Sequence, residues 1–226
     1  MSIEKSVGTN QRKTTVYVDG FNLYFALKEK KWFGFMWLDI AKLARSLLNP
    51  NQDLVAVKYF TSRIINDADK QKRQGLFLDA LGTLPKVSIF YGHYLEDGWI
   101  CNKCGNFSKI YHEKRTDVNI ATALLTDAYE NSFDDAIVIS ADSDLTSPIE
   151  AVCRLFNDKT VLVAFPPGRS SLHLARASTK QLHLTAKKFK KAVLPYEIRS
   201  ASGFVISCPK KWRAQPISNH QHTLWR

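Results

Sequence analysis

The chain has 226 residues, of which 45% are hydrophobic, a composition that excludes global disorder and predicts one domain, with or without appendages. Its 32 Lys and Arg residues exceed its 21 Asp and Glu residues, and the formal charge of +11 favours polyanionic partners. No apolar run could span a bilayer and residues 1–13 lack the apolar stretch of a signal peptide, so we expect a soluble, cytoplasmic protein with no membrane partner.

Strands and helices alternate along the first half of the chain. Residues 14–18 are β-branched and aromatic, which predicts a strand that ends at Asp19. The hydrophobic spacing that follows predicts these elements: helix 21–30, helix 38–48, strand 54–61, helix 69–81 and strand 87–94. Residues 95–111 bear Gly and Cys, and we expect them to form a hairpin excursion.

The same alternation continues in the second half. The predicted elements are a helix with Val118, Ala121, Leu125 and Ala128 on one face, strand 136–139, helix 145–156, strand 160–164, a short helix 171–177 and strand 181–184. This order predicts an α/β domain over residues 14–194, with a mostly parallel central sheet and helices on both faces. Residues 1–13 are expected to be a flexible N-terminus and residues 195–226 a basic C-terminal tail.

Four aspartates fall where such a domain would bring ligands together. Asp19 ends the first strand, Asp142 and Asp144 follow strand 136–139, and Asp117 begins the helix before that strand. Open parallel sheets bind ligands at the carboxyl ends of their strands, near the point where strand order reverses. Carboxylates held close repel unless a cation lies among them, and hard oxygen ligands suit Mg²⁺ or Mn²⁺. The pattern therefore predicts a metal site that activates water and stabilises charge on a phosphodiester.

Each position also has a purely structural interpretation. Asp142 and Asp144 could be loop residues, with Asp144 capping the next helix, and Asp117 could simply be a favourable partner of its helix dipole. Asn22 could be a plain N-cap. Ser170 could likewise cap the short predicted helix, rather than contribute to a phosphate site at its N-terminus. Only the placement of the acids around one expected cleft favours a functional role.

Three stretches that hold these residues resemble the motifs of one protein family. Val16 to Tyr24 resembles the opening motif of the NYN domain, a branch of the PIN-like nucleases, while Glu113 to Ala121 resembles its second motif and Ser140 to Leu145 its third. Shorter matches to the bacterial LabA-like subgroup are Tyr59-Phe60-Thr61, Lys72-Arg73-Gln74 and Tyr91-Gly92-His93. The resemblance covers residues 14–212, and three ordered motifs at the expected separations are specific.

The resemblance implies a PIN-like three-layer fold and a Mg²⁺- or Mn²⁺-dependent ribonuclease. Carried over by position, the catalytic and metal-binding residues would be Asp19, Asp117, Asp142 and Asp144. Asn22 and Ser140 would orient a ligand carboxylate, a water or a phosphate. The family usually has Gly where Ala141 stands, a small change unless the backbone there needs a positive φ.

Cys101 and Cys104 form a CxxC pair, which is half of a tetrahedral zinc site. His93 and His112 each lie eight residues from the nearer cysteine. In a flat hairpin, at roughly 3.3 Å per residue, that separation is far beyond bonding reach. Cys208 is a distant further candidate. A degenerate ribbon hairpin or a redox-sensitive pair is therefore favoured over a complete Zn²⁺ site.

Cations and aromatic residues are interleaved in three stretches, 28–32, 187–191 and 210–213. This pairing suits RNA phosphates and unpaired bases, although each run taken singly could be a solvated helix face. Lys114 and Arg115 are the favoured substrate-binding residues because they adjoin the second motif's aspartate.

The sequence thus favours a metal-dependent ribonuclease that cleaves single-stranded or structured RNA. A non-catalytic nucleic-acid-binding or regulatory adaptor with a residual metal site is the alternative, and metal-dependent cleavage separates the two. A phosphatase of the haloacid dehalogenase type is disfavoured, because Phe21 stands where that class commonly has a second acid. The oligomeric state stays open, a homo-oligomer included.

Overall fold

Six parallel strands form the central sheet of the computed structural model, which describes residues 11–65, 67–100, 103–104, 107–114 and 116–213. Of residues 93–100 and 107–114 only the backbone is described. The strand order is β3-β2-β1-β6-β7-β8, with β1 (Arg12–Asp19), β2 (Gln52–Thr61), β3 (Val87–Tyr91), β6 (Asp135–Ile139), β7 (Thr160–Phe165) and β8 (Lys180–His183). The chain builds outward from β1 to β3 and then returns to the other side of β1. The switch point of the sheet therefore lies between β1 and β6.

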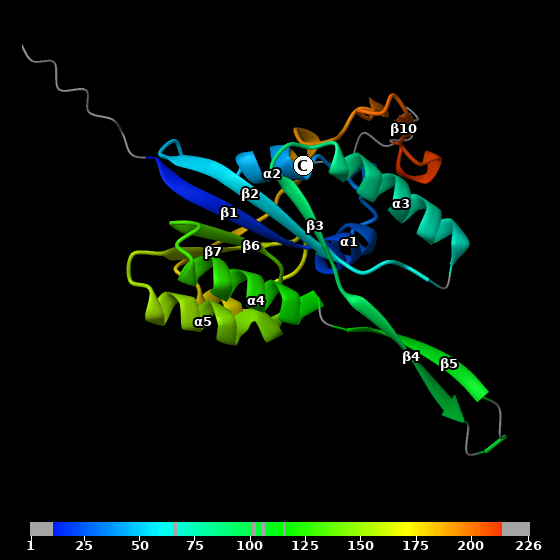
Figure 1. The fold of residues 1–226 in the computed structure, drawn as a ribbon, viewed down its shortest axis with the longest axis horizontal. Coiled ribbons are helices and arrows are strands. Elements are labelled where there is room, and N and C mark those ends of the chain that lie inside the picture. The colour runs from blue at the N-terminus through cyan, green and yellow to red at the C-terminus, as the bar shows by residue number, and fades with distance from the viewer. Residues whose placement is uncertain (1–10, 66, 101–102, 105–106, 115, 214–226) are drawn as a thin grey trace, which may run out of the picture.

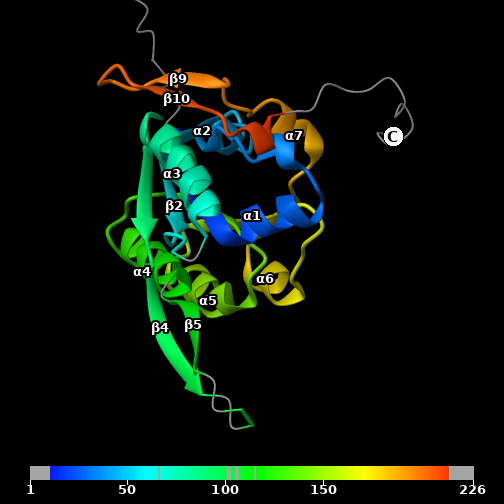
Figure 2. The same ribbon diagram turned by 90° about the vertical axis from the view of Figure 1, so that its right-hand side faces the viewer.

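Helices cover both faces of this sheet, as Figures 1 and 2 show. One face carries α1 (Gly20–Glu29), α2 (Ile40–Arg45) and α3 (Ala68–Gly82), and the other carries α4 (Thr116–Tyr129), α5 (Thr146–Leu155) and α6 (Leu172–Ala177). Side chains alternate along β1, so Val16 and Val18 join the core of the first face and Tyr17 the core of the second. The three layers confirm the predicted α/β fold, and the six-stranded sheet is parallel throughout.

The strand predicted at 87–94 is wrong, because the chain leaves the sheet at Gly92. β3 ends at Tyr91, and a separate antiparallel hairpin follows, formed by β4 (His93–Ile100) and β5 (Phe107–Lys114). This hairpin projects away from the body of the domain (Figure 1). The excursion is thus wider than residues 95–111, since both strands reach back to the edge of the sheet.

The helix predicted at 38–48 is shorter in the structure, and local capping explains why. Asp39 is the N-cap of α2 and accepts the N–H of Lys42 at 2.8 Å, so the helix cannot begin earlier. Ser46 is the C-cap, and its hydroxyl donates to the carbonyl of Leu43 at 2.7 Å. A short 3₁₀ turn precedes this helix at η1 (Phe33–Phe35), and another, η2 (Ser143–Leu145), precedes α5.

The C-terminal part of the described chain packs against the first face. It consists of α7 (Ala186–Lys190), the antiparallel pair β9 (Glu197–Arg199) and β10 (Val205–Ser207), and η3 (Lys210–Trp212). Phe189 and Trp212, the rings within the two C-terminal basic runs, are buried in the core. Phe189 is therefore not an exposed stacking surface, and Trp212 reaches only the wall of a cavity. Among the residues that the structure describes, no helix has the length and apolarity needed to cross a membrane.

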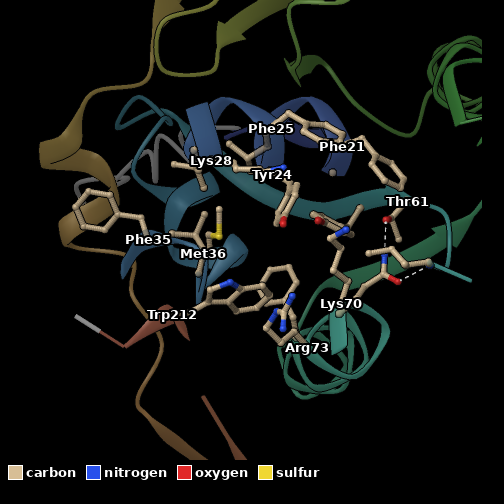
Figure 3. A pocket seen from close by; sticks show the side chains of 18 of the residues that line it. Phe21, Tyr24, Phe25, Lys28, Phe35, Met36, Thr61, Lys70, Arg73 and Trp212 are labelled. Atoms are coloured by element: carbon tan, nitrogen blue, oxygen red, sulfur yellow. Dashed lines mark hydrogen bonds between the residues drawn. The ribbon is translucent and has the colours of Figure 1, made fainter. Parts of the chain in front are cut away.

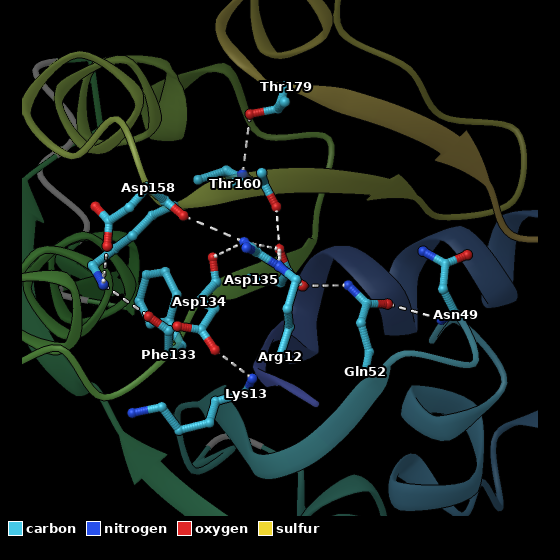
Figure 4. A network of polar contacts seen from close by, with 12 residues as sticks. Arg12, Lys13, Asn49, Gln52, Phe133, Asp134, Asp135, Asp158, Thr160 and Thr179 are labelled. Carbon is cyan, nitrogen blue, oxygen red and sulfur yellow. Dashed lines mark hydrogen bonds and ion pairs between the residues drawn. The ribbon is translucent and has the colours of Figure 1, made fainter. Parts of the chain in front are cut away.

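A buried carboxylate at the amino-terminal edge of the sheet is fully compensated (Figure 4). Asp135, the first residue of β6, is 4% exposed. Arg12 donates to both of its oxygens at 2.8 to 3.1 Å, Gln52 donates at 2.6 Å, and the Thr160 hydroxyl also donates. Burial alone would raise the pKa of Asp135, but these hydrogen bonds outweigh it and the pKa is lowered. The network ties the starts of β1, β2, β6 and β7 together.

Candidate metal centre

Asp19 is both the last residue of β1 and the N-cap of α1, so two elements fix its position. Its Oδ1 accepts the N–H of Asn22 at 2.9 Å, a bond that satisfies the helix start. The next residue, Gly20, has no room for a side chain. A Cβ there would lie 2.6 Å from the Tyr59 hydroxyl oxygen and 2.7 Å from the carbonyl oxygen of Phe60. The Asp19 carboxylate is therefore held in one place, and the residue is 4% exposed.

Ser140 and Asn22 connect Asp19 to the loop after β6. The Ser140 hydroxyl donates to Asp19 Oδ2 at 2.8 Å and accepts the N–H of Asp142 at 3.0 Å. Asn22 Oδ1 accepts the N–H of Ala141 at 3.2 Å. Both predicted supporting residues thus lie beside the acids, and the N-cap of α1 is Asp19 rather than Asn22.

Asp117 and Asp142 come close to Asp19 from the other side of the switch point. Asp117 lies in the first turn of α4, and Asp142 caps η2 by accepting the N–H of Asp144 at 3.0 Å. Asp19, Asp117 and Asp142 each offer one oxygen, and these oxygens lie within 4.8 Å of one another. They line a cavity of about 250 Å³, which we call the acid cavity; the other lining residues are Phe21, Asn22, Phe25, Thr116 and Arg169.

Burial and neighbouring charges raise the pKa of Asp19 and of Asp117. The pKa of Asp19 is raised to about 6, chiefly by burial and then by the charges of Asp117 and Asp142, although hydrogen bonds from Asn22 and Ser140 oppose the rise. The pKa of Asp117 is also raised, by burial and then by the charges of Asp142 and Asp144. Carboxylates that share a cavity relieve their repulsion by taking up protons or a cation. The oxygens of the three carboxylates lie close enough together to hold a metal ion.

Asp144 lies beside the group rather than in it. It is exposed in η2, and its charge contributes to the raised pKa of Asp117. Its oxygens are not among those that lie within 4.8 Å of one another. The structure therefore brings together three of the four predicted acids and places the fourth at their edge.

The predicted substrate-binding pair adjoins this site along the chain. Lys114 is the last residue of β5, two positions before α4 begins at Thr116. The hairpin thus leads directly into the helix that carries Asp117. The side chain of Lys114 and the whole of Arg115 lie outside the described residues.

The cysteines form no metal group in the part of the chain that the structure describes. Cys104 is a free, exposed thiol, and Cys208 is buried in the core. Cys101 lies outside the described residues. The three aspartates are the only described set of three or more His, Cys, Asp or Glu residues with metal-ligand spacing.

Arg169 lines the acid cavity, although the sequence did not single it out as a site residue. It follows Gly168, which has a φ of 74°, and its guanidinium pairs with the Glu29 carboxylate at 2.6 Å. The preceding Pro166-Pro167-Gly168 predicts a turn, but no local signal joins that turn to the end of α1. The N-cap of α6 is Ser171, which accepts the N–H of Leu174, rather than Ser170.

Known proteins resemble this chain in family, sequence and fold. The family model of the NYN domain matches residues 13–185. The chain is 20% identical to the 6-hydroxy-3-succinoylpyridine 3-monooxygenase HspA of Pseudomonas putida, over 95% of this chain and 80% of that protein. A crystal structure of a protein of unknown function from Vibrio parahaemolyticus aligns with a TM-score of 0.53 and 18% identity, over 82% of this chain and 98% of that chain. At that identity the structural likeness concerns the fold alone.

Proposed function

Since the chain belongs to the NYN domain family, we propose that it is a ribonuclease that hydrolyses RNA phosphodiester bonds with a bound Mg²⁺ or Mn²⁺. The family indicates a nuclease-type function. The observation that supports a metal-dependent reaction is the group of three carboxylates at the switch point of the sheet, with oxygens within 4.8 Å of one another. Such a site is where open parallel sheets bind their ligands.

The donor set of the acid cavity fits a hard divalent cation. Asp19, Asp117 and Asp142 offer only oxygen ligands, which suit Mg²⁺ and Mn²⁺. Arg169 is the only cationic residue that lines the cavity among the described residues, and it already pairs with Glu29. A divalent ion bound by the three acids would lower the pKa of a water and offset negative charge on the phosphate during reaction.

The chain's own residues would position that reaction. Ser140 fixes the Asp19 carboxylate and the backbone of Asp142 through one hydroxyl, so the two acids keep a constant relation. Asn22 uses its Oδ1 to hold the loop after β6, and its Nδ2 is left to donate to a phosphate or a water at the cavity wall. We assign Asp144, beside Asp117, to orienting the attacking water.

The strong positive charge of the chain would attract RNA toward the acid cavity. The net charge of +11 favours a polyanion. Lys114 ends the projecting hairpin, and Arg115 follows it in the sequence, directly before α4. Arg169 is 24% exposed at the cavity wall and would contact a phosphate. The free thiols of Cys104, Cys153 and Cys208 suit a reducing, cytoplasmic location.

A second candidate is the binding of a small aromatic acid. The similar Pseudomonas protein is named for an oxygenase that acts on a succinoylpyridine, and an aromatic-lined cavity adjoins the acid cavity in this chain. The nuclease is favoured because the NYN family model matches residues 13–185, whereas the Pseudomonas protein is only 20% identical to this chain.

Cleavage of a panel of single-stranded and hairpin RNAs in Mn²⁺, Mg²⁺ or EDTA tests the proposal. We expect metal-dependent cleavage that Asp142→Asn removes while the variant still binds RNA. Metal should also raise the wild-type melting temperature by binding the folded state, and much less so in the variant. A wild-type protein with neither response would overturn the nuclease in favour of a binding adaptor.

A further inference from the structure

A second cavity, of about 230 Å³, lies between α1 and α3 on the first face of the sheet (Figure 3). We call it the aromatic cavity, because rings form much of its wall, among them those of Phe21, Tyr24, Phe35 and Trp212. Sites for drug-sized ligands measure roughly 300 to 1,000 Å³. The aromatic cavity is smaller, so it suits a single ring system rather than a whole nucleotide.

The hydroxyl group of Tyr59 lies in the wall of the aromatic cavity. Tyr59 is 6% exposed, and its hydroxyl makes no hydrogen bond to any residue that the structure describes. Burial and then the charge of Asp19 raise its pKa, so the hydroxyl remains a donor at neutral pH. The Tyr59 hydroxyl is therefore available to donate to an acceptor atom on a ligand in the cavity.

The charged residues around the aromatic cavity are all cationic. Lys28, Lys70 and Arg73 line it, and no described lining residue is acidic. Lys70 pairs with Asp67 at 2.8 Å, while Arg73 makes no ion pair among the described residues. In Figure 3 Tyr24 and Lys70 point toward the same space from opposite helices, with Arg73 and Trp212 on the α3 side. The ligand should therefore combine a planar ring with negative charge next to it.

The aromatic cavity and the acid cavity share a wall. Phe21 and Phe25, one turn apart on α1, line both, and their rings stack with centroids 6.3 Å apart. Gly20 lines the aromatic cavity directly after Asp19, which lines the acid cavity. A single ligand that places a ring in one cavity can thus place a phosphate in the other.

We propose that the aromatic cavity receives an unpaired base of the RNA, next to the phosphate that lies at the three aspartates. This inference rests on the proposed nuclease function and makes the substrate single-stranded at the cut. Rings would stack on the base, the Tyr59 hydroxyl would donate to one of its acceptor atoms, and Arg73 would contact a flanking phosphate. Because every base offers a flat face, the site would select unpaired RNA and would discriminate little between base sequences.

Binding of single-stranded RNA with 2-aminopurine at one position tests the inference. The base loses fluorescence on stacking, and the Asp142→Asn background without metal keeps the RNA intact. We expect quenching at one position in the strand and about tenfold weaker binding in Tyr24→Ala, a size typical of one lost base stack. Tyr129→Ala is the matched control, because Tyr129 is 83% exposed on α4. Replacing the quenched base by an abasic residue should make Tyr24→Ala and its parent bind equally.

Arg73→Gln gives a second variant, at a half-buried residue of α3, which keeps the test valid if Tyr24→Ala fails to fold. Its control is Lys72→Gln, the exposed neighbour that does not line the cavity. Arg73→Gln should weaken RNA binding several-fold more than Lys72→Gln does. If both cavity variants match their controls while the wild type still cleaves RNA with metal, the inference is overturned and the nuclease stands. If the wild type binds no RNA but binds benzoate in an Arg73-dependent way, both proposals fall and the ligand is a small aromatic acid.

Discussion

Asp19 and Asp135 are buried aspartates on neighbouring central strands, at opposite ends of the same sheet, and their surroundings differ in kind. Asp135 receives hydrogen bonds from Arg12, Gln52 and Thr160, and its pKa is lowered. Asp19 receives two neutral hydrogen bonds and faces two further carboxylates, and its pKa is raised to about 6. Burial alone therefore does not set the direction in which the pKa of a carboxylate shifts. The groups that face the carboxylate decide it.

The largest expected effect tests the function of the uncompensated group. Asp142→Asn should lower metal-dependent RNA cleavage at least about 100-fold, the size seen when one strong electrostatic contact to a transition state is removed. RNA affinity without metal should hold or rise, because the amide repels phosphate less than the carboxylate does. Cleavage rates and filter-binding affinities give both quantities. Asp158→Asn, at the exposed amino-terminal edge, is the control, and equal rates in the two variants would remove Asp142 from the site.

Replacement of Asp135, at the amino-terminal edge of the sheet, should change the stability of the protein and not the cleavage of RNA. Asp135→Asn should lower the free energy of unfolding by about 2 to 3 kcal/mol, somewhat below the roughly 3 to 5 kcal/mol of fully buried pairs, because the Arg12 side chain is 38% exposed. Urea denaturation measures the change, and metal should not alter the difference from wild type. A decrease in the free energy of unfolding of less than about 0.5 kcal/mol would show that the network contributes little to stability.

Asp19→Asn should do the opposite and stabilise the metal-free protein at pH 8. A pKa raised from 3.8 to about 6 means that the ionised carboxylate costs up to about 3 kcal/mol. That cost is absent below pH 4, grows as the pH rises from 4 to 6 and is complete above pH 6, so the variant's advantage should follow the same course. Thermal unfolding from pH 4 to 8 in EDTA checks the sign. A variant less stable than wild type at pH 8 would contradict it, and Mn²⁺ should reverse the order by stabilising the wild type alone.

The smallest effect concerns the hydroxyl that joins two of the acids. Ser140→Ala should weaken Mn²⁺ binding about tenfold, the lower end of what loss of a residue behind a metal ligand costs. Isothermal titration calorimetry measures the affinity. Ser140→Thr keeps a hydroxyl and should lose less, whereas equal losses in both variants would point to crowding instead of a lost hydrogen bond.

The ends of the central strands could be predicted because the hydrophobic run of each strand stops at a recognisable position in the sequence. An aliphatic run stops at Asp19 and another stops before Asp142, and a parallel sheet brings such ends to one edge. The break at Gly92 could not be found in this way, since residues on both sides of it are extended and only their partners differ. Hydrophobic periodicity predicts that a segment is extended and which side of it is buried, but it does not predict which strand the segment pairs with.

The remaining parts of the site depend on contacts between distant segments. Arg169 reaches Glu29 across 140 positions, and the Tyr59 hydroxyl lies against Gly20 only in the folded chain. The compensation of Asp135 by Arg12 is equally remote along the chain. Sequence could therefore propose which acids meet, but not which of them the fold neutralises.

The hydrogen bond from Ser140 to Asp19 spans 121 positions, and this separation has a consequence during synthesis. At about 5 to 20 residues per second, Ser140 is made roughly 6 to 24 s after Asp19. Strand β6 must then insert beside β1 before the three acids can meet. A nascent chain therefore contains Asp19 well before the residues that hold and face its carboxylate have been made.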